Sequence, residues 1–185
     1  MRPAVSIADF VSGLLQLESD GFQTESVQEY LLETAIISSS LELYLHFHRT
    51  HYMRNLIYRA EGFELLAICW ESGQAAPIHD HDEQRCWARV EHGTLRFTNF
   101  HLVCETPLLL EQAGPVLSGT TGHLDALAGI HRVENHLSSA GRAVSVHLYA
   151  SPFAECTTYD PVRGLRQRRQ LGYDTVPGPE RTFRS

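Results

Sequence analysis

Residues Gly73–Gly93 read GQAAPIHDHDEQRCWARVEHG, and this stretch decides how the chain is expected to fold. It contains two histidines, His79 and His81, with one residue between them. Side chains on an extended strand alternate between its two faces, so both imidazoles would point the same way. Glycines at both ends permit tight turns at the rim of a barrel. The pattern therefore predicts a metal-binding pair of histidines in a β-rich fold.

A third histidine, His131, could complete one face of a metal ion from a distant segment, and Asn135 follows it by four residues. Three neutral imidazoles leave up to three positions open on a six-coordinate ion. Such a ligand set suits Fe(II), which accepts nitrogen ligands and reacts with oxygen, although zinc with a bound water uses the same side chains. The three histidines together predict a metal centre, with iron as the expected ion.

Size, charge and cysteine usage narrow the class of protein. The chain has 185 residues, long enough for a substantial core, and we expect one domain over residues 1–185. Its formal net charge of −7 argues against nucleic acid as a partner, because phosphate binding needs a basic surface. No stretch approaches the roughly 20 apolar residues of a membrane helix. The four cysteines form no CxxC pair and the N-terminus lacks a secretory layout, so we expect a cytoplasmic protein with reduced thiols.

The first third of the sequence has the apolar spacing of helices. One helix is expected from about Ile7 to Leu17, with Ser6 as its N-cap. A second is expected over about 26–37, and a third short helix through Leu45. These segments predict a small helical cap over residues 1–50.

The rest of the chain is rich in short runs of β-forming residues separated by turn signals. The expected strands cover 54–59, 63–70, 86–91, 94–102 and 144–149. Many short strands at regular spacing favour an antiparallel barrel, here over residues 51–162. Residues 163–185, including the basic run 163–169, are expected to form an irregular, solvated tail on the surface. The fold class is therefore mainly β, with an N-terminal helical cap.

A second His-x-His pattern, His46 and His48 with His51 nearby, carries less weight. It falls in the expected third helix and its continuation, where side chains two residues apart point in different directions. We interpret these histidines as surface residues.

The landmarks of residues 73–93 also fit the first motif of the cupins: a glycine, five residues, His-x-His, a glutamate and a closing glycine. Cys86 stands where that glutamate is usual. The chain resembles one branch of the cupins, the cysteine dioxygenases or thiol dioxygenases, over about residues 52–159. The stretches that carry the resemblance are Tyr52-Met-Arg54-Asn-Leu, Ile68-Cys-Trp70, Ile78-His-Asp-His81, His131-Arg-Val-Glu-Asn135 and Ser145-Val-His147-Leu-Tyr149. The resemblance implies a single jelly-roll-like cupin barrel.

The resemblance also implies a metal ion and a reaction. His79, His81 and His131 would hold Fe(II), which L-cysteine would chelate through its thiolate and its amine while O2 takes the remaining position. Both oxygen atoms would pass to sulfur and give cysteine sulfinic acid. A neutral cysteine in place of the glutamate leaves the ion its full positive charge, which favours an incoming thiolate.

The substrate side of the site is implied in the same way. Arg54 would anchor the substrate carboxylate through two parallel hydrogen bonds, with Tyr52 as its phenolic neighbour. Tyr149 would place its hydroxyl near the iron, and His147 with Ser145 would orient it. A polar barrel interior accounts for Ser145 and His147 equally well.

One position of the resemblance implies a covalent modification. In the family, a cysteine at the position of Cys86 can form a thioether crosslink with the tyrosine at the position of Tyr149. This chain is therefore expected to be crosslink-competent, although a lone cysteine is more often a small buried hydrophobe. Trp70 is expected to pack behind the site as part of the core.

Several alternatives stay open at this point. Relatives that act on 3-mercaptopropionate have glutamine where this chain has Arg54, so the chain resembles the arginine type and L-cysteine is the expected substrate. A 3-mercaptopropionate dioxygenase, or a non-catalytic cupin that binds a metal or small ligand as a sensor, are the alternatives. A glutamate-type cupin such as an isomerase is disfavoured by Cys86. We expect a monomer that acts on a small thiol and O2, without nucleic acid or membrane partners.

Overall fold

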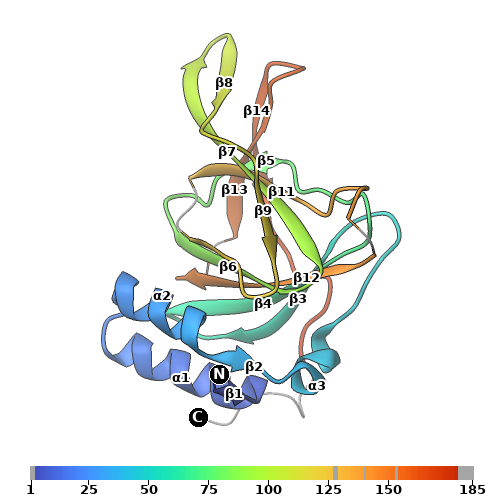
Figure 1. Ribbon diagram of the computed structural model, residues 1–185. Helices are drawn as coiled ribbons and strands as arrows, with labels where there is room; N and C mark the ends of the chain where they lie inside the picture. Colours follow the sequence, from blue (N-terminus) through green and yellow to red (C-terminus); the bar gives the residue numbers. More distant parts are fainter. Residues whose placement is uncertain (1–2, 127–128, 140, 153, 179–185) are drawn as a thin grey trace.

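The computed structural model describes residues 3–126, 129–139, 141–152 and 154–178, and this part of the chain is mainly β (Figure 1). The helices are α1 (Ile7–Ser19), α2 (Thr24–Glu33), α3 (Ser38–Leu41) and the 3-10 helix η1 (Glu42–Tyr44). The strands are β1 (Ala4–Val5), β2 (Ala35–Ile36), β3 (Met53–Arg59), β4 (Phe63–Trp70), β5 (Ile78–His79), β6 (Arg85–His92), β7 (Thr94–Glu105), β8 (Leu108–Gln112), β9 (Leu117–Thr120), β10 (Leu124–Ala126), β11 (Ile130–Glu134), β12 (Ala143–Ala150), β13 (Glu155–Asp160) and β14 (Leu165–Gln170). Within the described ranges, no helix combines the length and the apolar character needed to cross a membrane.

Helix α1 begins where the sequence predicts. The side-chain oxygen of Ser6 accepts a hydrogen bond from the backbone N–H of Asp9, as an N-cap does. The buried residues of the helix are Ile7, Phe10, Val11 and Leu14. They share one apolar cluster with residues of β4 and β12, so the helices cover one face of a sheet (Figure 1). The predicted helical cap is confirmed.

The second and third helices are shorter than predicted. Helix α2 ends at Glu33, because Ala35–Ile36 leave the helix and pair in parallel with Ala4–Val5. The third helical segment, α3 with η1, ends before His46 and His48. These two histidines therefore lie in an irregular segment, not in a helix, which corrects the prediction; both are exposed, as expected.

Strand β4 lies inside the five-stranded sheet, whose order is β10-β6-β12-β4-β3. One face of β4 joins the cluster beneath the helices through Phe63, Leu65, Ala67 and Cys69. The other face joins a second, interior cluster through Leu66, Ile68 and Trp70. Burial on both faces explains why residues 63–70 form a nearly continuous apolar run in the sequence, interrupted only by Glu64.

The second sheet has the order β14-β13-β5-β11-β7-β8, and β9 also pairs with β7. The interior cluster takes side chains from both sheets: Trp70 and Tyr149 from the first, Phe97 and Val133 from the second. The two sheets thus enclose one apolar interior, and the predicted β-barrel architecture is confirmed.

Gly93 is the last residue of the stretch 73–93 from which the fold was predicted, and the structure explains why this position is a glycine. It links β6 to β7 with a φ of +74°, a left-handed conformation that favours glycine. A Cβ atom at this position would lie 2.5 Å from the carbonyl oxygen of Arg142. The turn conformation and the close packing against Arg142 both require a residue without a side chain.

The C-terminal region is not the irregular surface tail that the sequence predicts. Residues 165–170 form β14, which pairs with β13 along its whole length, although their side chains are exposed as expected. Leu171–Thr175, which we call the C-terminal strap, then runs along β3, where the N–H of Leu56 donates to the carbonyl of Thr175 at 3.0 Å. Because β3 is an edge strand, its main-chain groups need partners, and the strap supplies them. Residues 179–185 of the predicted tail lie outside the described part of the chain.

Candidate metal centre and substrate pocket

The three predicted ligands come together. His79 in β5 and His131 in β11 are directly opposite each other in paired strands, and His81 follows β5 by two residues. One ring nitrogen from each side chain lies within 4.8 Å of the others. This arrangement gives one ion three nitrogen ligands on a single side.

Hydrogen bonds orient two of these imidazoles, those of His79 and His131. Nδ1 of His79 lies 2.9 Å from the carbonyl oxygen of Pro77, and Nδ1 of His131 lies 3.2 Å from a carboxylate oxygen of Asp125. Both Nδ1 atoms therefore carry the proton, which leaves Nε2 with its lone pair for a metal. Nε2 of His131 is buried and has no hydrogen-bond partner among the described residues, as a ligand atom would be without its ion. The donor set thus fits a metal ion.

Asp80, between the two histidines of the motif, fixes their segment in place. One of its carboxylate oxygens accepts the backbone N–H of Thr157 at 2.9 Å, and the other accepts the hydroxyl of Tyr159 at 2.9 Å. The side chain therefore points to β13, away from the histidines, as alternation along an extended chain requires. The sequence analysis assigned no role to Asp80 or Asp125, because nothing in their spacing indicated one.

The electrostatics of the centre keep the imidazole of His79 neutral. Loss of hydration lowers the pKa of His79 well below its ordinary value, and the neighbouring His131 and His81 lower it further. A neutral imidazole is the form that binds a metal ion. The cluster is therefore ready for a positive ion at neutral pH without first releasing a proton from His79.

Cys86 and Tyr149 face each other across two paired strands. They are direct neighbours in the register of β6 with β12, and their side chains hydrogen-bond. Burial raises the pKa of both groups far above ordinary values, so thiol and phenol both keep their protons. The sequence prediction placed these two residues together, and the structure does the same.

A chain of polar side chains leads from Trp70 to Tyr149 through the barrel interior. The indole N–H of Trp70 donates to the hydroxyl of Ser145 at 3.1 Å. That hydroxyl lies 2.9 Å from Nε2 of His147, whose Nδ1 lies 3.3 Å from the hydroxyl of Tyr149. Burial, with the nearby charge of Arg54, lowers the pKa of His147 well below its ordinary value, so the imidazole is neutral. The expected core role of Trp70 is thus incomplete, since it also begins this chain.

Arg54 lies between Tyr149 and the C-terminal strap. Its guanidinium is 5.9 Å from the centre of the Tyr149 ring, and its Nε donates to the carbonyl of Gly172 at 3.1 Å. Tyr52 stacks on Trp70 with ring centres 4.6 Å apart. Arg54 and Tyr52 line one pocket of about 560 Å³ together with Tyr149 and the candidate ligand His79.

One wall of this pocket was missed by the sequence prediction. It is made of residues 169–174, which include the end of β14 and most of the strap. Basic and aromatic residues there give no periodic signal, and the contacts that hold the strap connect positions more than a hundred residues apart. Only a folded chain brings this wall to the site.

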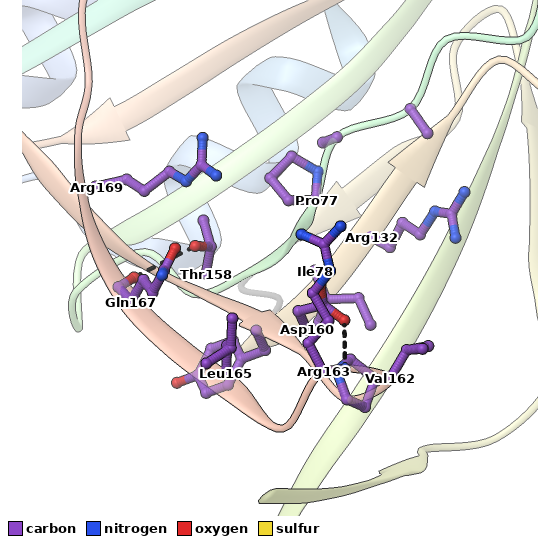
Figure 2. Close-up of a pocket in the computed structure, with 14 residues that line it drawn as sticks. Pro77, Ile78, Arg132, Thr158, Asp160, Val162, Arg163, Leu165, Gln167 and Arg169 are labelled. Carbon is purple, nitrogen blue, oxygen red and sulfur yellow. Dashed lines mark hydrogen bonds and ion pairs between the residues drawn. The ribbon is translucent and has the colours of Figure 1, made fainter.

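A second groove, of about 520 Å³, adjoins the pocket (Figure 2). The two share Pro77, Thr158 and Arg169. Arg163 and Asp160 in the groove are joined through the Arg163 backbone N–H at 3.0 Å. None of the candidate metal ligands lines this groove, so we place the site in the pocket that His79 lines.

The sequence was then compared with those of known proteins. Residues 2–162 match the protein family described as Cysteine dioxygenase type I. Cysteine dioxygenase type 1 of Rattus norvegicus is 29% identical over 182 residues, covering 96% of this chain and 90% of the rat protein. The Danio rerio protein of the same name is 31% identical over 173 residues, covering 89% and 83%.

Among solved structures, a Klebsiella pneumoniae protein with a double-stranded beta-helix domain matches with a TM-score of 0.45. Its sequence identity is 15%, and the match covers 65% of this chain and 95% of that chain. A cupin 2 conserved barrel domain protein from Leptotrichia buccalis matches with a TM-score of 0.46 and 10% identity, covering 60% of this chain and 47% of that chain.

Proposed function

The chain belongs to the cysteine dioxygenase type I family and is an enzyme of that kind, and we propose that it uses Fe(II) to oxidise L-cysteine with O2 to cysteine sulfinic acid. The observation that supports this proposal best is the shared pocket of His79, Arg54 and Tyr149. A metal ligand, a carboxylate-binding guanidinium and a phenol there surround a space large enough for an amino acid.

The metal would be held by His79, His81 and His131. Fe(II) bound there would supply a Lewis-acid site for the thiolate and the redox chemistry that O2 requires. Three neutral ligands, with Cys86 protonated nearby, leave the positive charge of the ion unreduced. An anionic thiolate is thereby favoured at the ion.

Arg54 would bind and orient the substrate. Its planar guanidinium matches the geometry of a carboxylate, and Tyr52 lies beside it in the pocket. With its carboxylate held by Arg54, L-cysteine would direct its amine and thiol toward the metal. The same contact would exclude thiols with no acidic group from tight binding.

Tyr149 would act as a hydrogen-bond donor to the reacting groups. Burial keeps its phenol protonated, and His147 with Ser145 holds the hydroxyl in one direction. We assign Tyr149 and Cys86 to the reaction site and His147 to the positioning of Tyr149.

Oxygen uptake with a panel of thiols tests the proposal. Iron-loaded protein should consume O2 faster with L-cysteine than with 3-mercaptopropionate, and the sulfinate should appear in the product by mass spectrometry. Faster turnover of 3-mercaptopropionate would reassign the substrate. Tightly bound zinc with no thiol-dependent uptake would instead support a non-catalytic metal-binding protein.

We further propose that turnover joins Cys86 to Tyr149 by a thioether. One S–H and one ring C–H bond would be replaced by an S–C bond, with two protons and two electrons passing to O2. The intact mass should fall by that of two hydrogen atoms, and Cys86→Ser should abolish the change. An unshifted mass after prolonged turnover with L-cysteine would contradict the crosslink.

We propose that residues 1–185 form one domain that acts as a monomer in the cytoplasm. The four cysteines are all free, which fits a reducing compartment. Size-exclusion chromatography with light scattering tests the monomer directly.

A further inference from the structure

The C-terminal strap holds Arg54 by three hydrogen bonds, which come from two of its residues, Gly172 and Asp174. The backbone N–H of Arg54 donates to a carboxylate oxygen of Asp174 at 2.7 Å, and the N–H of Asp174 donates back to the carbonyl of Arg54 at 2.9 Å. The carbonyl of Gly172 accepts Nε of the guanidinium at 3.1 Å. Both the main chain and the side chain of Arg54 are therefore fixed by the strap.

We propose that Asp174 is a positioning residue for substrate binding, acting through Arg54; this inference rests on the function proposed above. With Nε directed to Gly172, the terminal N–H groups of the guanidinium remain for the pocket that Arg54 lines and for Tyr149, with which the Arg54 side chain hydrogen-bonds. Those N–H groups are the ones that bind a carboxylate with two parallel bonds. Asp174 keeps Gly172 in register with Arg54, so it determines where the guanidinium points.

Asp174 also connects the strap to the segment before β3. Its second carboxylate oxygen lies 3.4 Å from Nε2 of His51, and both residues line the pocket. One carboxylate thus joins three segments at the pocket rim: His51, the start of β3 and the strap.

The strap has other contacts that keep it in place when Asp174 is replaced. The hydroxyl of Tyr173 donates to Glu64 and accepts from Arg59, and Thr175 donates to the amide oxygen of Asn55 at 2.9 Å. Replacing Asp174 should therefore shift Arg54 locally and leave the strap bound to β3.

The test compares Asp174→Ala, Asp174→Asn and the control Asp160→Asn in full-length, iron-loaded protein. Asp160 also accepts a backbone N–H, from Arg163, but is the last residue of β13 and does not line the pocket. For Asp174→Ala we expect KM for L-cysteine to rise about tenfold, with a smaller change in kcat. Asparagine keeps an oxygen acceptor for the Arg54 N–H, so Asp174→Asn should recover most of the loss, and Asp160→Asn should match wild type.

Two measurements separate positioning from general damage. Turnover of 2-aminoethanethiol, which has no carboxylate, should be unaffected by Asp174→Ala. In an Arg54→Gln background, Asp174→Ala should cost nothing further, because both changes remove the same interaction. An unchanged KM in Asp174→Ala would overturn the proposal, and so would an equal loss with 2-aminoethanethiol or a full additional loss beside Arg54→Gln.

Anaerobic calorimetry of L-cysteine binding to the same iron-loaded proteins provides a readout apart from turnover. Wild-type protein that binds L-cysteine but does not oxidise it would contradict the proposed reaction, while the Kd ratio of Asp174→Ala to wild type still decides the positioning role. An about tenfold weaker Kd supports that role, and an equal Kd overturns it. Failure of wild-type protein to bind L-cysteine would overturn both.

Discussion

The pocket has two walls that are encoded differently in the chain. The first, which we call the metal wall, contains the candidate ligand His79; it depends on the close spacing of His79 and His81 and on the pairing of one further strand that brings His131 opposite. The second, which we call the substrate wall, joins Arg54 to Asp174, which lies 120 residues later. A ligand set with strand periodicity is therefore visible in the sequence, whereas a wall built by a strap along a sheet edge is visible only after folding.

Among substitutions that affect the metal wall, we expect His131→Ala to have the largest effect. With one nitrogen ligand lost, we expect bound iron to disappear and kcat/KM to fall at least about 100-fold, since even the groups that orient metal ligands are worth about 10–100-fold. Elemental analysis and oxygen uptake measure both effects. His101→Ala, at an exposed position of β7, is the matched control and should change neither. Full iron content in His131→Ala would remove this residue from the ligand set.

Arg54→Gln breaks the substrate wall and should leave the metal wall intact. Loss of a charged, two-bonded contact to the carboxylate should raise KM for L-cysteine about 10–100-fold, with iron content unchanged. Arg166→Gln, an exposed arginine that pairs with Glu105 at 2.6 Å, is the control and should behave as wild type. A wild-type KM in Arg54→Gln would exclude Arg54 from substrate binding.

The pH dependence of stability tests the series of hydrogen-bonded side chains that leads from Trp70 through His147 to Tyr149. The folded protein holds the pKa of His147 well below its ordinary value of 6.5, so only the unfolded chain takes up this proton as the pH falls. The free energy of unfolding of the metal-free protein should therefore fall below about pH 6.5, by at most about 1.4 kcal/mol per pH unit for each such histidine. Above that pH this residue should contribute no slope.

Urea denaturation between pH 5 and 8 measures the effect, and His147→Gln is the variant that isolates it. The variant should lose stability less steeply than wild type on acidification. Equal slopes in the two proteins would mean that His147 does not resist protonation in the folded state.

Tyr173→Phe removes a hydrogen bond between the C-terminal strap and Glu64 of β4. Glu64 is fully buried, and one of its oxygens has no hydrogen-bond partner among the described residues while the other accepts from Tyr173. Removing the phenol hydroxyl should destabilise the protein by about 1–3 kcal/mol, because a buried carboxylate loses its donor. Chemical denaturation at pH 7 gives the value.

The matched control is Tyr30→Phe in the helical cap. The hydroxyl of Tyr30 donates to the neutral carbonyl of Phe10 at 3.0 Å, so its loss should cost less, about 0.5–1.5 kcal/mol, and should not alter activity. A larger loss in Tyr30→Phe than in Tyr173→Phe would show that the strap contact contributes little to stability.

Local patterns determined most of the architecture. The capped first helix, the core strand over 63–70 and the placing of His79 beside His81 all follow from short-range spacing and from strand alternation. Cys86 and Tyr149 were also placed together correctly, through a resemblance carried by several short motifs. In these features, the spacing of apolar and polar residues along the sequence already indicates which face is buried.

The tertiary structure alone decided the roles of Asp80, Asp125 and the C-terminal strap. The sequence predicted a solvated tail after residue 162, because polar and basic residues carry no periodic apolar signal. What orders Leu171–Thr175 is the unpaired edge of β3, and the need of its main-chain N–H and carbonyl groups for partners appears only once the sheet has formed. The sequence thus determined the barrel and the candidate metal ligands, and long-range packing decided how Arg54 is held beside them.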